Sequence, residues 1–89
     1  MMAFRLTYTP RFHKHFASLT AQEKKQVSRK LSLFAENPLH PSLRVKRIQG
    51  ADGLFEFSVD MDIRVIWCRE GDVLILLLDI GHHDILKQF

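Results

Sequence analysis

The alternation of apolar and polar positions in residues 54–67 predicts two β-strands, 54–59 and 63–67, joined by a tight turn. Successive side chains of a strand point to opposite faces of its sheet. One face therefore collects the apolar residues of both strands: Phe55, Phe57, Val59, Ile63, Val65 and Trp67. We expect this face to pack against the core, and we expect the working surface on the opposite face, which carries Glu56 and Arg64.

Local signals predict one strand and two helices ahead of this pair. Residues 3–8 alternate between apolar and polar positions, as a half-buried strand does. Thr9 followed by Pro10 is an N-cap with proline at the first helical position, and the helix that it opens is short. Residues 20–23, Thr-Ala-Gln-Glu, form a capping box that opens a second helix, which ends at the Asn-Pro pair of residues 37–38.

The remaining patterns complete the predicted sheet. Residues 43–48 alternate only in part, because Lys46 and Arg47 interrupt the pattern. Residues 73–80 are an almost continuous apolar run, which is typical of a strand buried on both faces. The predicted order is β-α-α-β-β-β and the fold class is α+β. We expect a single domain over residues 1–89, in which an N-terminal helical hairpin packs on one face of a small, mostly antiparallel sheet.

Composition favours a small folded protein of the cytoplasm. Of the 89 residues, 46% are apolar and 26% are charged, which excludes a disordered chain and is enough for one core. The single cysteine, Cys68, cannot form an internal disulfide, as suits a reducing compartment. No signal peptide is recognisable, and the longest apolar run, residues 73–78, is too short to cross a membrane as a helix.

Charge is distributed unevenly along the chain. Residues 1–50 contain ten lysines and arginines but only two acids, whereas residues 51–89 contain eight acids and three basic residues. A basic half would suit a polyanionic partner, and an acidic half could complement it internally. Solvated helix faces with a few salt bridges explain the same pattern, so charge alone does not select a function.

The element order and four short motifs resemble the RelE/ParE superfamily of bacterial toxins. The motifs are Leu43-x-x-Lys46-x-Ile48-x-Gly50, Leu54-Phe55-Glu56-x-x-Val59, Asp62-Ile63-Arg64-Val65-Ile66 and a Gly81-x-His83 ending. The resemblance covers nearly the whole chain, and it rests on the order and spacing of the motifs more than on any one of them. It implies the toxin of a type II toxin–antitoxin pair, with a cognate antitoxin as protein partner.

The ribonuclease branch of this superfamily cuts messenger RNA on the ribosome, using the ribose 2′-hydroxyl as nucleophile and needing no metal or other cofactor. The resemblance implies that Arg64 stabilises the phosphorane-like charge, that His83 is a general acid or a phosphate contact, and that Phe89 stacks on a base. Glu56 and Ser58 stand where some members carry two lysines, and Glu56 is the candidate general base. These residues would supply the acid, base and cation that the reaction requires.

Further residues are assigned supporting parts. Three basic residues of the 43–48 segment are expected to contact phosphates, although a solvated strand edge explains them equally well: Arg44, Lys46 and Arg47. Asp84 would orient a neighbouring imidazole or cap the last turn, and His82 lies beside the proposed acid. No metal site is expected, because adjacent histidines rarely bind one metal. Three other histidines are interpreted as surface residues: His13, His15 and His40.

Two other functions stay open. The ParE branch shares the fold, poisons DNA gyrase and needs no catalytic residues, and a catalytically silent binding module is also compatible with the scaffold. Glu56 and Arg64 would then be an ordinary cross-strand ion pair, worth little on an exposed surface.

Overall fold

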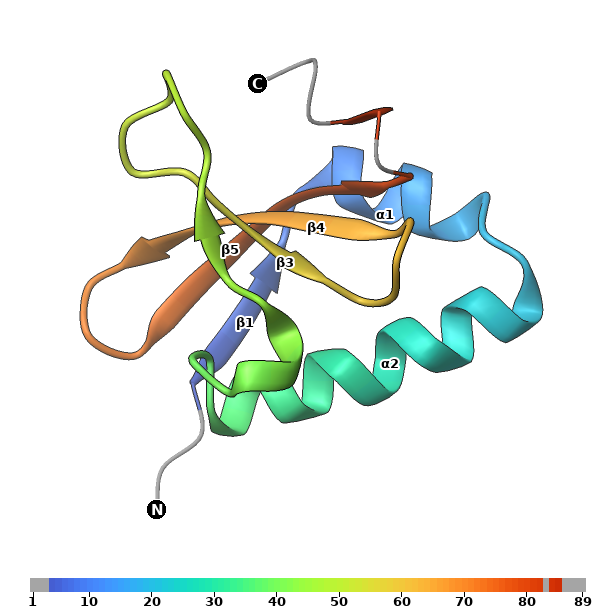
Figure 1. Ribbon diagram of the computed structural model, residues 1–89, viewed down its shortest axis with the longest axis horizontal. Coiled ribbons are helices and arrows are strands. Elements are labelled where there is room, and N and C mark those ends of the chain that lie inside the picture. Colours follow the sequence, from blue (N-terminus) through green and yellow to red (C-terminus); the bar gives the residue numbers. More distant parts are fainter. Residues whose placement is uncertain (1–3, 83, 86–89) are drawn as a thin grey trace.

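The computed structural model describes residues 4–82, 84 and 85, and it shows an α+β fold with both helices in the N-terminal half (Figure 1). The elements are β1 (Arg5–Tyr8), α1 (Pro10–Ala17), α2 (Ala21–Glu36), a 3₁₀ turn (Pro41–Leu43), β2 (Lys46–Arg47), β3 (Phe55–Ser58), β4 (Arg64–Glu70) and β5 (Leu74–Gly81). No helix in this part of the chain is both long and apolar enough to cross a membrane.

The sheet has the strand order β1-β5-β4-β3-β2, with β1 parallel to β5 and every other pair antiparallel. The mostly antiparallel sheet is therefore confirmed, with one strand more than predicted. The additional strand is β2, a two-residue edge strand within the partly alternating segment 43–48. The first residues of this segment are not part of a strand, since Leu43 ends a 3₁₀ turn and Arg44 adopts the left-handed conformation, with φ 50°. Apolar and polar positions therefore do not alternate regularly over residues 43–48.

Both predicted helix starts are confirmed by their capping contacts. The Thr9 hydroxyl accepts a hydrogen bond from the Phe12 backbone at 3.0 Å. The Thr20 hydroxyl accepts from the Glu23 backbone at 3.1 Å, and the Glu23 carboxylate accepts from the Thr20 backbone at 2.8 Å. These contacts satisfy amide groups that the first turn of a helix leaves without partners.

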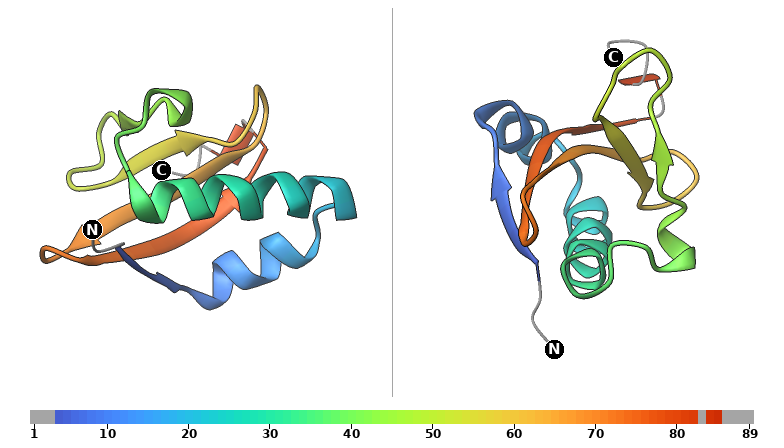
Figure 2. Two further views of the ribbon diagram at one scale, coloured as in Figure 1. Left: turned by 90° about the horizontal axis from the view of Figure 1, so that it is seen from below. Right: turned by 90° about the vertical axis from the view of Figure 1, so that its left-hand side faces the viewer.

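The main core lies between α2 and the predicted apolar face of the sheet. Figure 2 shows α2 running across one side of the strands. The Phe34 ring of α2 packs 4.5 Å from the Phe57 ring and 4.9 Å from the Trp67 ring, measured between centroids. Phe55 is only half-buried, but its ring stacks on Trp67 at 4.8 Å. The apolar face is thus confirmed.

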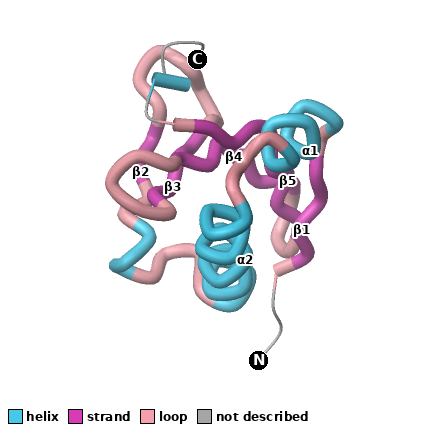
Figure 3. The backbone as a smooth tube through the Cα atoms, turned by 90° about the vertical axis from the view of Figure 1, so that its right-hand side faces the viewer, coloured by secondary structure: helices cyan, strands magenta, loops and turns pink. Residues whose placement is uncertain are grey.

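A β-bulge between β4 and β5 changes the face to which the end of β5 points. Ile66 pairs with Asp79, whereas Trp67 pairs with Leu77, so that one extra residue of β5, Leu78, stands between these two positions. Ile75, Leu77 and Ile80 all lie in the core, and Asp79 is turned to the opposite face. Figure 3 shows α1 beside β5. Two side chains of α1, Arg11 and His15, contact Asp79.

Candidate functional site

Glu56 and Arg64 share one face of the sheet, as predicted. Arg64 Nε lies 3.6 Å from Glu56 Oε1, and the two side chains are only 14% and 12% exposed. Arg64 Nη1 also donates to the backbone oxygens of Asp60, at 2.9 Å, and Ile63, at 3.3 Å. The pair is therefore a mostly buried, oriented contact. It differs from a cross-strand ion pair on an exposed surface, which was the alternative interpretation of these two residues.

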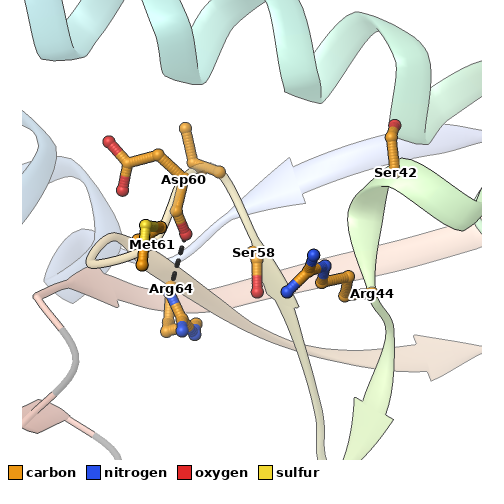
Figure 4. Close-up of a pocket in the computed structure, with 7 residues that line it drawn as sticks. Ser42, Arg44, Ser58, Asp60, Met61 and Arg64 are labelled. Carbon is orange, nitrogen blue, oxygen red and sulfur yellow. Dashed lines mark hydrogen bonds between the residues drawn. The ribbon is translucent and has the colours of Figure 1, made fainter.

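An open pocket adjoins this pair, between the 3₁₀ turn and the β3–β4 turn. It is lined by Ser42, Arg44, Ser58, Val59, Asp60, Met61 and Arg64. In Figure 4 the guanidinium of Arg44 extends toward Ser58, and Arg64 lies on the other side of that serine. Two guanidinium groups around one small opening suit an anion such as a phosphate, because each guanidinium can donate two parallel hydrogen bonds. We call this opening the arginine pocket.

Arg44 reaches the arginine pocket through an uncommon backbone conformation. Its φ and ψ are both 50°, in the left-handed region that residues other than glycine seldom occupy. Its backbone N–H donates to Pro41 O at 3.2 Å, which closes the 3₁₀ turn. Within the described residues its guanidinium makes no hydrogen bond or ion pair, so its donors remain available to a ligand.

The two basic residues of β2 point to different faces. Lys46 pairs with Glu56 across the ladder, so it lies on the same face as Glu56 and Arg64. Arg47 pairs with Phe55, and its guanidinium lies 6.0 Å from the centroid of that ring. Both are exposed. The structure therefore brings Lys46 to the side of the arginine pocket and leaves Arg47 on the other side.

His82 follows β5 and connects three elements. Its Nδ1 forms a hydrogen bond with Asp62 Oδ2 of the β3–β4 turn, and its Nε2 lies 3.6 Å from Glu23 Oε2 at the start of α2. The hydrogen bond with Asp62 is the main reason why the pKa of His82 is raised above its usual 6.5; burial opposes this rise, and the charges of Asp62, Glu23 and Asp84 add to it. His83 and Phe89 lie outside the described residues.

Replacing Asp62 by asparagine is expected to lower the pKa of His82 toward 6.5, since it removes the carboxylate that favours the protonated ring. With the folded pKa above the unfolded one, the stability that this contact contributes is complete below the unfolded pKa and is lost as pH rises through the folded pKa. An NMR titration of the imidazole measures the shift, with the exposed Asp72→Asn as control. An unchanged pKa in Asp62→Asn would contradict this assignment.

A buried carboxylate and its contact with a histidine were not predicted from the sequence. Asp79 is fully buried; its Oδ1 lies 2.6 Å from His15 Nδ1 and its Oδ2 lies 2.9 Å from Arg11 Nε. His15, which was interpreted as a surface residue, is half-buried, with a side chain that is 36% exposed, and its contact with Asp79 was not predicted. His13 on the same helix is exposed. The one available signal was an aspartate inside the apolar run 73–80. In residues 4–82, 84 and 85, no three histidine, cysteine or acidic side chains are grouped as a metal site would require.

Comparisons with known proteins identify relatives by fold. No family model matches the chain, and no curated protein matches it. Solved structures do match over nearly the whole chain. The toxin–antitoxin complex DinJ–YafQ of E. coli aligns over 96% of this chain and 98% of the matched chain, with 20% identity and a TM-score of 0.74. The fold is that of the YafQ and RelE toxins.

Two RelE structures give the same result. The archaeal RelE–RelB complex from Pyrococcus horikoshii OT3 aligns over 91% of this chain and 96% of the matched chain, with 19% identity and a TM-score of 0.74. The intact E. coli RelBE toxin–antitoxin complex aligns over 89% and 95%, with 17% identity and a TM-score of 0.70. At these identities the similarity to solved structures concerns the fold alone. Evidence for a function comes from the residues of the arginine pocket.

Proposed function

We propose that this protein is the toxin of a type II toxin–antitoxin pair and that it inhibits translation by cutting messenger RNA on the ribosome. The observation that carries the proposal is the arginine pocket. It places two guanidinium groups and the Ser58 hydroxyl on the face that holds Glu56, in a fold shared with the YafQ and RelE toxins. Such a pocket suits the phosphate of a nucleic-acid backbone.

In this proposal the arginine pocket holds the scissile phosphate. Arg64, fixed by Glu56 and by two backbone oxygens, stabilises the negative charge that develops when the 2′-hydroxyl attacks phosphorus. Arg44 and Lys46 position the neighbouring backbone through phosphate contacts that carry no sequence information. The sequence-based assignments of His83 as acid and Phe89 as base-stacking residue stay predictions, as does Glu56 as general base.

The proposed protein partner is a cognate antitoxin. The solved relatives DinJ–YafQ, RelE–RelB and RelBE are toxin–antitoxin complexes. In this chain the basic first half offers charge that would complement an acidic segment. We infer that such a segment, disordered when free, lies over the sheet and the basic face and blocks access to the arginine pocket.

Induced expression of the protein alone is expected to arrest growth by stopping translation, because translated messages are cut. Primer extension on a reporter message would show new 5′ ends within its translated region, and co-expression of the antitoxin should remove them. Intact messages together with accumulating DNA breaks would contradict the proposal and support the gyrase-poison alternative.

A further inference from the structure

A second pocket lies at the end of β5, and His15 forms part of its wall together with Ser18, Gly81 and His82. The His15 side chain is 36% exposed, whereas its partner Asp79 is fully buried. Because Nδ1 of His15 is bound to Asp79, Nε2 is the ring nitrogen left to accept a proton. A carboxylate that fixes one imidazole nitrogen and leaves the other open is the arrangement of a proton-transfer pair.

Asp79 is held so that it can orient His15. Its Oδ1 accepts the Ile80 backbone N–H at 2.8 Å in addition to the His15 contact, and Arg11 Nε lies 2.9 Å from its Oδ2. A buried carboxylate with these contacts has little freedom to rotate.

The β-bulge places this pair on the face of the proposed reaction. Glu56 pairs with Ile66, and Ile66 pairs with Asp79, so the three residues form one row across the sheet. Gly81 lines the same pocket as His15, and it pairs with Arg64 of β4. Directly paired Cα atoms of antiparallel strands lie roughly 5 Å apart. The two pockets thus adjoin the same end of the β4–β5 pair.

We propose that His15, oriented by Asp79, is the base that activates the ribose 2′-hydroxyl; this inference rests on the proposed ribonuclease function. His15 Nε2 takes the hydroxyl proton as the 2′-oxygen bonds to the adjacent phosphorus. The bond from phosphorus to the 5′-oxygen breaks, and that oxygen takes a proton from water. The products are a 2′,3′-cyclic phosphate and a 5′-hydroxyl, and His15 returns its proton to solvent.

His15 suits this role better than Glu56 does. The Glu56 carboxylate is engaged by the Arg64 guanidinium, with Nε 3.6 Å from Oε1, and its side chain is only 12% exposed, whereas the His15 side chain is 36% exposed. An imidazole exchanges protons near neutral pH, where a base is most effective. The charged groups nearest the ring are Asp79, which is fully buried, and Arg11, which is bound to Asp79 and is 53% exposed. His82 and Asp84 are the titratable groups that line the same pocket.

The experiment is single-turnover cleavage of a reporter message on programmed ribosomes between about pH 5 and pH 9, a range that brackets imidazole titration. In His15→Asn the amide nitrogen can replace Nδ1 and donate to Asp79, but it cannot titrate. We expect a loss of about 10²-fold or more at neutral pH and a rate that no longer rises with pH through the imidazole range. His13→Asn, on the exposed side of the same helix, should keep the rate and the pH profile.

Each outcome is decisive. A pH-dependent rise that persists in His15→Asn, or that vanishes in Glu56→Gln, overturns the inference while the ribonuclease function stands. A wild-type protein that leaves the message intact overturns both. If His15→Asn does not fold, the histidine pKa values of the unmodified protein are measured by ¹⁵N NMR. Agreement of the His15 value with the kinetic pKa supports the role, and a difference of more than about one unit overturns it.

Discussion

Replacing Arg64 by alanine is expected to lower the rate of message cleavage about 10²–10³-fold, which would restore growth of cells that express the protein. Arg64 is the one arginine that lines the arginine pocket and is also fixed by a carboxylate and two backbone oxygens. A donor held in place before the reaction stabilises developing charge without reorganisation. The rate is measured by primer extension, and toxicity by growth after induction.

Two control variants and two measurements on Arg64→Ala separate the chemistry from binding and folding. Arg29→Ala removes an exposed arginine of α2 and should leave the rate unchanged. Lys46→Ala should weaken RNA binding modestly and reduce the slope of log affinity against log salt by about 0.7, the value for one phosphate contact on a single strand. Circular dichroism and antitoxin binding monitor the fold of Arg64→Ala. A folded Arg64→Ala protein that kills at the wild-type dose would leave Glu56 and Arg64 as a structural ion pair.

Replacing Trp67 by alanine is expected to lower the free energy of unfolding by about 3–5 kcal/mol. The Trp67 side chain packs between the rings of Phe34 and Phe55, and the residue is 5% exposed. Small domains are stable by only about 5–15 kcal/mol, and each kcal/mol shifts the melting temperature by about 4–8 °C at this size. Thermal melting followed by circular dichroism should therefore show a fall of at least about 12 °C.

Two further variants test this explanation of the Trp67 effect. Met61→Ala, at a position that is 93% exposed, should change the free energy of unfolding by less than about 0.5 kcal/mol. Trp67→Phe should cost less than Trp67→Ala, because it keeps an aromatic ring in place. It also removes a buried indole N–H that finds no hydrogen-bond partner in the described part of the chain. An unchanged melting temperature in Trp67→Ala would contradict the core assignment.

Sequence reasoning succeeded where the controlling interactions are local. Thr9 and Thr20 start their helices through contacts with residues three positions away, and such contacts can be inferred from a few letters. The alternation in residues 54–67 assigned Glu56 and Arg64 to one face, and the structure agrees. Proposals for His83 and Phe89 still rest on the resemblance, because both residues lie outside the described part of the chain.

It failed where distant segments decide the outcome. Simple alternation along β5 would have placed Asp79 in the core with Ile75 and Leu77; the bulge at Leu78 turned it toward α1 instead. A bulge depends on how two strands pair, so a single strand does not reveal it. The contact between His15 and Asp79 was missed for the same reason, since the two residues are 64 positions apart in the chain.

By itself, the sequence determined the fold class, the two helix starts and the face on which Glu56 and Arg64 lie, because each follows from periodicity or from contacts within one turn. Only the tertiary structure decided that β1 pairs in parallel with β5, that Arg44 reaches the arginine pocket, and that Asp79 is buried beneath His15. The physical reason is that these arrangements depend on pairing, burial and charge contacts between segments that are far apart in the chain, and a local pattern carries no record of which segments will meet.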